Sequence, residues 1–237
     1  MIRKLESTFP LTDEEREAVL RLPLQVTEIR ADQDIVREGD RPSRCFAILE
    51  GFTCTYKFTG AGKRQIMAFH IAGDIPDLQS LHLKLLDNSI STIAPCKVGF
   101  IQHQALHELC LRYPRITSAF WRDTLIDAST FREWLANIGR RDGISRMAHL
   151  FCEILVRMRV VGLTADHSCD LPITQAELAD ATGLSTVHVN RTLQELRGAG
   201  LLQLERGRLT ILDWHKLKEV GDFDPAYLHL QNAQAAA

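Results

Sequence analysis

The chain lacks long apolar runs and closely spaced cysteines. No segment reaches the roughly 18 consecutive apolar residues of a membrane span, and the first residues, MIRKLESTFPLTDEE, lack the apolar centre of a signal peptide. The cysteines are too scattered for a recognisable disulfide framework or zinc site; they are Cys45, Cys54, Cys96, Cys110, Cys152 and Cys169. These absences predict a cytoplasmic protein with no membrane partner, whose thiols are reduced and mostly buried.

Catalytic and metal-binding motifs are also missing. The sequence contains no glycine-rich phosphate loop, nucleophile elbow or metal-ligand cluster. The spacing of four histidines follows no ligand motif; these are His70, His82, His103 and His107. We therefore predict that the protein is not an enzyme and holds no metal or cofactor.

The charge balance gives no general sign of nucleic-acid binding. The formal net charge is −2, whereas many DNA-binding domains are visibly basic. Any evidence for DNA binding must therefore come from local residues. The 45% hydrophobic content of the 237 residues is enough for two domains with real cores.

Short apolar segments separated by turn residues extend from about Leu24 to Gln102. CFAILEG, TCTYKFTG and RQIMAFHIAG recur at roughly ten-residue spacing with partial alternation, as in a small antiparallel barrel or roll. The N-terminal segment, which includes TDEEREAVLRL, predicts a helix packed at the entrance of this roll.

A long helix is predicted after Pro114, because apolar or small residues recur there at steps of three and four. The stripe consists of Ile116, Phe120, Thr124, Ala128, Phe131, Leu135 and Ile138. Trp121, Leu125 and Trp134 add apolar bulk beyond it. A twofold partner helix would cover this surface, and packing on its own roll alone is the alternative.

The segment IGRRDG contains two glycines and three charges, and it predicts a hinge between two domains. The following segment, SRMAHLFCEILVRMRVV, repeats apolar positions at helical spacing. It predicts the first helix of the C-terminal domain.

The most specific local pattern is TQAELADATGLSTVHVNRTLQELR, from Thr174 to Arg197. Thr174 and Glu177 predict a capping box. Gly183 permits the positive φ that lets the chain reverse, and Ser185 caps a second helix. Small and apolar residues would hold the two helices together; they are Leu178, Ala179, Leu184, Val189, Leu193 and Leu196. The pattern predicts a helix-turn-helix, with an ordinary helical hairpin as the alternative.

The second helix, about 186–197, presents a polar face when its apolar residues point inward. Arg191 can bind guanine O6 and N7, and Asn190 can pair with adenine or contact a phosphate. Thr186 and Val187 can touch a thymine methyl group. The helix residues that we predict to bind DNA are Ser185, Thr186, Val187, His188, Asn190 and Arg191.

A β-hairpin wing is predicted after Gly198-Ala199-Gly200, where LLQLERGRLTILD contains two short apolar strands. Arg206 and Arg208 at its tip complete the predicted DNA-binding set as phosphate contacts. Solvated charge on a turn is the alternative for both arginines.

The order of these parts resembles the Crp-Fnr superfamily of bacterial transcription regulators over nearly the whole chain. The similar segments are REGDRPSRCFAILEG, AGKRQI, IAGD, the long helix, GRRDGISRMAHLFCEIL and LSTVHVNRTLQELR. The resemblance implies an α+β protein with an N-terminal double-stranded β-roll, similar to cyclic-nucleotide-binding jelly rolls, over residues 1–103. A dimerisation helix at 104–138 and a winged helix-turn-helix at 139–237 would follow.

The resemblance implies a homodimer on a palindromic DNA site, with half-sites about one helical turn apart. Arg191 matches the guanine-contacting arginine of the family. Val187 stands where many members carry a base-reading Glu, and Thr186 where others carry Arg, so the usual half-site is not expected. RNA polymerase is implied as a further partner.

The nucleotide pocket of cyclic-AMP-binding members pairs a Gly-Glu turn with an Arg and a small hydroxyl residue. The matching positions here are Gly73, Asp74, Asn88 and Ser89, with Asp in place of Glu and Asn in place of Arg. Because the Arg fork neutralises a phosphate, cyclic AMP is not expected. Another small effector at these residues and a purely structural roll both remain open.

Redox sensing has limited support in the sequence. No cysteine precedes Cys45, whereas iron–sulfur members of the family place several near the N-terminus. Cys169 is a candidate redox thiol if it is exposed and its pKa is lowered, and an inert buried thiol is the alternative. A second functional hypothesis makes the roll an effector-binding module that regulates a partner protein without sequence-specific DNA binding.

Overall fold

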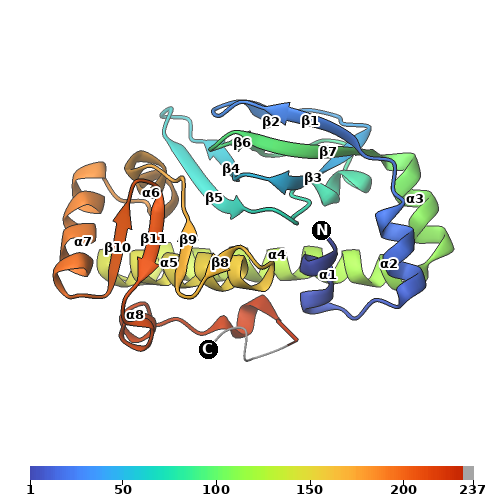
Figure 1. Ribbon diagram of the computed structural model, residues 1–237. Helices are drawn as coiled ribbons and strands as arrows, with labels where there is room; N and C mark the ends of the chain where they lie inside the picture. Colours follow the sequence, from blue (N-terminus) through green and yellow to red (C-terminus); the bar gives the residue numbers. More distant parts are fainter. Residues whose placement is uncertain (232–237) are drawn as a thin grey trace. The chain divides into compact units, whose positions relative to one another are not determined.

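The computed structural model describes residues 1–231 and consists of two compact units (Figure 1). The first unit contains Met1–Lys57 and Ala68–Ala128. The second contains Phe58–Met67 and the chain from Ser129 onward. One short segment from the N-terminal half of the sequence therefore groups with the C-terminal unit.

Two antiparallel sheets form the N-terminal roll. The first has the strand order β1-β7-β3, with β1 at Gln25–Ile29, β7 at Cys96–Gln102 and β3 at Arg44–Glu50. The second has the order β2-β6-β4-β5, with β2 at Asp34–Val36, β6 at Ser89–Thr92, β4 at Thr53–Phe58 and β5 at Arg64–His70. The predicted α+β class with a double-stranded β-roll is confirmed.

Strand β3 is buried on both faces, which explains its nearly continuous apolar sequence. Phe46 and Ile48 belong to the hydrophobic cluster inside the roll. Cys45 and Ala47 point the other way, into a second cluster built with helices. The period-two alternation of a strand thus serves two cores.

Helices cover the second face of β3. They are α1 (Ile2–Thr8), α2 (Asp13–Leu20), the 3-10 helix η1 (Leu78–Leu81) and α3 (His103–Arg112). Leu5, Val19 and Leu106 pack in this cluster. The N-terminal segment forms two helices where one was predicted, because Thr12 begins α2 with a capping box of its own.

The long helix α4 spans Pro114–Arg140, two residues beyond the predicted end at Ile138. Its buried face differs from the predicted stripe after Phe120 and includes Asp123, Thr130 and Asn137. The opposite face exposes large apolar side chains. Trp121 is 67% exposed, Leu125 56%, Phe131 41% and Leu135 74%.

The second unit contains the helices α5 (Gly143–Val160), α6 (Gln175–Thr182), α7 (Thr186–Gly198) and α8 (Trp214–Val220), and the 3-10 helix η2 (Pro225–Leu228). Its sheet has the order β10-β11-β9-β8. The strands are β8 (Thr164–Ala165), β9 (Ser168–Asp170), β10 (Leu202–Glu205) and β11 (Arg208–Ile211). The predicted winged helix-turn-helix is present, with two strands more than the sequence indicated.

Within residues 1–231, no helix combines the length and the apolarity needed to cross a bilayer. All six cysteines are free thiols, and five of them are buried.

Asp77 is a buried carboxyl in the first unit, and its surroundings predict that the stability of this unit depends on pH. Its carboxyl is 1% exposed and accepts a hydrogen bond from the Phe46 amide at 3.0 Å. Burial raises its pKa from 3.8 to about 7. Because the folded pKa is higher, the contribution of Asp77 to stability is greatest below the unfolded pKa and is lost as pH rises through the folded pKa.

We predict that Asp77→Asn, whose amide oxygen can still accept from Phe46, removes this loss. Between pH 5 and pH 8 the wild type should lose roughly 1–3 kcal/mol more unfolding free energy than the variant. Thermal unfolding at both pH values measures the difference, and Asp87→Asn, an exposed site in the same unit, is the control. Parallel pH profiles for the wild type and Asp77→Asn would contradict the prediction.

Candidate nucleic-acid interface

Helix α6 begins at a capping box and ends at a glycine. The Thr174 hydroxyl accepts from the Glu177 amide at 3.2 Å, and the Glu177 carboxylate accepts from the Thr174 amide at 2.7 Å. Gly183 has φ 67, a conformation that L side chains rarely adopt, and it reverses the chain toward α7. The local geometry is the one predicted from the sequence.

Helix α7 begins at Ser185, whose side chain accepts from the His188 amide at 3.2 Å. Val189, Leu193 and Leu196 are buried and pack α7 on α5 and α6. Four of the residues predicted to bind DNA lie on the opposite, exposed face of α7; they are Thr186, Val187, Asn190 and Arg191. Val187 is 79% exposed, although it is a large apolar residue.

The exposed face of α7 holds a chain of side-chain amides. Asn190 Nδ2 donates to Gln175 Oε1 at 3.3 Å, and Gln194 Nε2 donates to Asn190 Oδ1 at 3.1 Å. Arg191 Nε lies 3.6 Å from Glu195 Oε1, one turn further along the helix. Gln175, at the start of α6, thus joins the predicted surface and was missed from the sequence.

His188 is less exposed than the other residues of α7 that were predicted to bind DNA. It is half-buried, and a Cβ placed on Gly143 would lie 2.7 Å from its Nε2. The imidazole therefore fills the space left by the glycine at the start of α5. This packing favours a structural role for His188 over base contact.

Arg146 of α5 connects the helix-turn-helix to the end of α4. Its guanidinium donates to the carbonyl oxygen of Thr182, at the end of α6, and to those of Ile138 and Arg141. A cation there satisfies carbonyl groups that helix ends leave unpaired. Burial lowers the pKa of the guanidinium from its usual value.

The wing is the β10–β11 hairpin. Its turn consists of Arg206 and Gly207, both with positive φ, at 50 and 76. Such a two-residue turn matches the twist of the strands. Arg206 is exposed at the tip, whereas Arg208 pairs with Asp170 of β9 at 3.3 Å.

The candidate effector residues form part of the framework of the roll. The Gly73 amide donates to the Ile48 carbonyl. Asp74 is buried, and its carboxylate accepts from the Ile71 amide at 2.9 Å and lies 3.1 Å from Lys4 Nζ. The carboxylate of Asp74 is therefore engaged with protein groups.

Ser89 begins β6 in the second sheet of the roll, and Asn88 immediately precedes it. Asn88 is buried, and the Ser89 hydroxyl accepts from the Glu38 amide at 3.0 Å. Asn88 and Ser89, like Asp74, are thus part of the framework of the roll. Asn88 supplies no guanidinium that could bind a phosphate.

Cys169 lies in β9 and is buried. Burial raises the pKa of its thiol to about 11. A reactive thiolate needs exposure and a lowered pKa, so this environment favours the inert alternative.

The four histidines considered from the sequence do not converge. His70 Nε2 lies 2.7 Å from the Thr55 hydroxyl, and His103 Nε2 lies 2.9 Å from the Ser80 hydroxyl. His82 and His107 contact each other edge to face. Within the part of the chain that the structure describes, no three His, Cys, Asp or Glu side chains are grouped to hold a metal ion.

Two domain models match the sequence. Residues 26–113 match a cyclic nucleotide-binding domain, and residues 145–220 match a Crp-like helix-turn-helix domain. The first match covers most of the roll, and the second covers α6, α7 and the wing.

Curated relatives are regulators. The chain is 23% identical to electron transport regulator A of Shewanella oneidensis over 80% of this chain and 75% of that protein. It is 22% identical to the transcriptional activator protein FnrA of Stutzerimonas stutzeri over 78% and 75%. The structure of FixK2 from Bradyrhizobium japonicum superposes with a TM-score of 0.75 at 21% identity, over 83% of this chain and 96% of that one.

We predict that Thr174→Ala destabilises the second unit by about 1 kcal/mol, because the start of α6 loses its side-chain cap. Thr174→Ser, which keeps the hydroxyl, should stay near the wild type. Thermal unfolding of the full chain measures both. Equal stability of Thr174→Ala and Thr174→Ser would show that the cap contributes nothing.

Proposed function

The chain belongs to the Crp-Fnr family, since it joins a cyclic nucleotide-binding domain to a Crp-like helix-turn-helix domain, and we propose that α7 is its DNA-reading helix. The protein is a sequence-specific DNA-binding transcription regulator that acts as a homodimer on a palindromic site. The observation that supports the role of α7 is its exposed face, where Asn190 and Arg191 lie opposite the buried Val189, Leu193 and Leu196.

We assign Arg191 to guanine readout. Its guanidinium is on the exposed face of α7 and can reach O6 and N7 of guanine in the major groove. Asn190 reads adenine or a phosphate, while Thr186 and Val187 contact thymine methyl groups. Ser185 at the start of α7 and Arg206 at the wing tip contact phosphates, and Arg208 contributes after exchanging Asp170 for the backbone.

The exposed apolar face of α4 forms the dimer contact. Trp121, Leu125 and Leu135 lie on the side of the helix opposite its buried residues. A contact between two α4 helices would remove these side chains from water in both subunits at once. The α4 face therefore supports the homodimer.

The roll does not bind cyclic AMP in this proposal. Asn88 replaces the phosphate-binding arginine, and the Asp74 carboxylate faces Lys4. The roll binds either a different small effector or no effector at all. RNA polymerase is the partner at promoters, and the protein works in the cytoplasm, where bacterial DNA lies.

We predict that Arg191→Ala lowers the preference for a palindromic over a scrambled duplex by roughly 1–3 kcal/mol, with the loss confined to one base position. Fluorescence anisotropy at fixed, near-physiological salt measures it. Arg206→Ala should weaken binding to both duplexes alike and reduce the salt slope by about one. Arg21→Ala, at the exposed residue that follows α2, is the matched control.

Retained base preference in Arg191→Ala would exclude the assigned role. If the wild type does not distinguish the two duplexes, the roll acting on a protein partner becomes the better explanation.

We predict that Leu125→Glu and Leu135→Glu each weaken the dimer, because a carboxylate would be buried at the twofold contact. Sedimentation equilibrium measures the dissociation constant, which should rise at least about tenfold. Leu111→Glu, at an 83% exposed site on α3, is the control. A dimer unaffected by either α4 change would place the contact elsewhere.

A further inference from the structure

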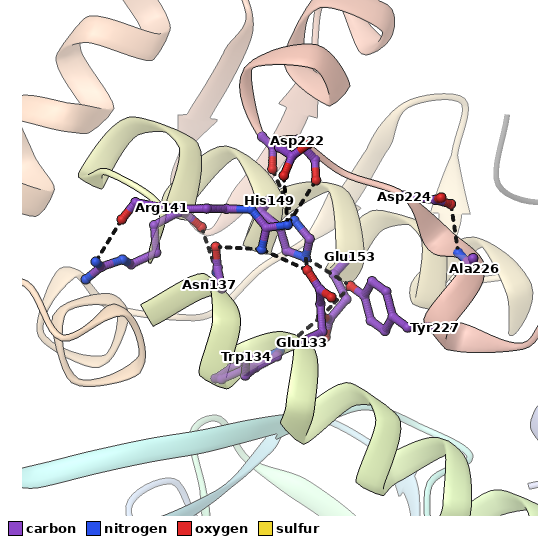
Figure 2. A network of polar contacts seen from close by, with 12 residues as sticks. Glu133, Trp134, Asn137, Arg141, His149, Glu153, Asp222, Asp224, Ala226 and Tyr227 are labelled. Atoms are coloured by element: carbon purple, nitrogen blue, oxygen red, sulfur yellow. Dashed lines mark hydrogen bonds and ion pairs between the residues drawn. The ribbon is translucent and has the colours of Figure 1, made fainter. Parts of the chain in front are cut away.

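A buried carboxylate, that of Glu153, belongs to a network of polar contacts in the second unit (Figure 2). Glu153 of α5 is 0% exposed. Its Oε2 accepts from Trp134 Nε1 of α4 at 3.0 Å and from the Tyr227 hydroxyl of η2 at 2.8 Å. Its Oε1 accepts from Arg157 at 3.2 Å. Oε2 of Glu153 therefore joins the long helix α4 to η2 in the C-terminal segment.

His149, one turn earlier on α5, contacts the same segment. Its Nδ1–H donates to the Gly221 carbonyl at 3.1 Å, and its Nε2 lies 3.2 Å from the Tyr227 hydroxyl. The ring stacks on Tyr227 and meets Phe223 edge to face. Burial, and then the charge of Arg141, lower the pKa of His149, so the imidazole is neutral near pH 7.

Arg141 forms a second link, in the turn between α4 and α5. It pairs with Glu133 of α4 at 2.8 Å and with the Asp222 carboxylate at 3.2 Å. Arg141 also donates to the Asp222 carbonyl at 3.1 Å. The segment from Gly221 to Leu228 thus contacts α5 and the turn directly, and it is linked to α4 through Glu153 and Arg141.

These contacts matter because a buried charge is tolerated only when it is paired and hydrogen-bonded. Moving the end of α4 away from α5 would take the Trp134 indole from Glu153. Releasing the C-terminal segment would take the Tyr227 hydroxyl from the same carboxylate. Both movements are therefore opposed by the cost of an unsatisfied buried anion.

We propose that Gly221–Leu228, the C-terminal clamp, fixes the last turns of α4 on α5 and thereby sets the spacing of the two recognition helices on DNA. This inference rests on the proposed function. Leu135 lies in the proposed dimer face and α7 lies in the same unit as the end of α4, so the clamp controls how far α7 stands from the twofold axis. Successive base pairs are about 3.4 Å apart, so a small shift of α7 changes the half-site spacing that the dimer fits. Tyr227 and Trp134 act as positioning residues.

The experiment compares two clamp variants with the control Tyr56→Phe. The clamp variants are Tyr227→Phe, within the clamp, and Trp134→Phe, which removes the α4 donor to the same carboxylate. Tyr56 provides a matched control, because its hydroxyl also donates to a carboxylate at 2.8 Å, that of Asp34 in the roll. Each change keeps an aromatic ring and removes one hydrogen-bond donor. Circular dichroism confirms folding, and Trp134→Phe tests the inference if Tyr227→Phe does not fold.

Amide hydrogen exchange is the first measurement, and it needs no DNA. In both clamp variants the amides of 129–140 should exchange about tenfold faster, as expected for a lost hydrogen bond to a charged group, while those of 186–197 stay within about twofold. Unchanged exchange at 129–140 would overturn the clamp.

The second measurement uses three duplexes: the preferred palindrome, the same palindrome with one central base pair added, and a single half-site. Both clamp variants should lose about fivefold or more of the preference for the native spacing, and half-site affinity should remain within about twofold. Tyr56→Phe should match the wild type on all three. Spacing preference equal to that of the wild type would overturn the role on DNA.

A wild type that prefers no palindrome would overturn both the proposed function and the spacing role. The exchange data would then decide separately whether the clamp holds α4 on α5.

Discussion

The arrangement of the elements in the second unit depends on the hydrogen-bond partners of two charged side chains of α5. Arg146 faces the carbonyl ends of α6 and α4, and Glu153 faces donors from α4 and η2. Apolar burial alone would leave helices free to slide, because hydrophobic contact is non-directional. Directed hydrogen bonds to a cation at one end of α5 and an anion at its centre select one arrangement of the elements around it.

The same constraint explains why the domain needs its C-terminal residues. The apolar face of α5 packs against α7 and α8, yet Glu153 would remain an incompletely satisfied anion without Tyr227. Removal of one partner from such a site costs more than a hydrogen bond normally contributes. The C-terminal segment therefore completes the polar contacts of Glu153 on the buried face of α5.

Local signals in the sequence predicted the helix-turn-helix well. A capping box acts over three residues and a glycine turn over one, so Thr174, Glu177 and Gly183 could be interpreted without tertiary context. The faces of α4 could not, because its buried side includes Asp123, Thr130 and Asn137 while apolar residues occupy both sides. Hydrophobic periodicity fails where polar residues are buried with partners.

The contacts around Glu153 were also not predicted from the sequence. His149 and Glu153 stand at buried positions in SRMAHLFCEIL, a segment interpreted as an apolar helix face. Two ionisable side chains within that face were the signal that could have been used. Strands β8 and β9 were missed because strands of two and three residues carry no alternation to detect. They are defined by their pairing, of β9 with β11 and of β8 with β9.

The free protein also shows which interactions compete with DNA for the predicted arginines. The Arg191–Glu195 pair is separated by 3.6 Å, with side chains 67% and 47% exposed. Such exposed pairs one helical turn apart contribute about 0.3–0.5 kcal/mol, whereas a bidentate guanine contact contributes about 1–3 kcal/mol. The guanine contact is the stronger of the two, so Glu195 can orient the guanidinium of Arg191 without holding it back from a base. Arg208 faces a similar exchange of Asp170 for phosphate, but the gain there carries no base information, since phosphate contacts fix register and not sequence.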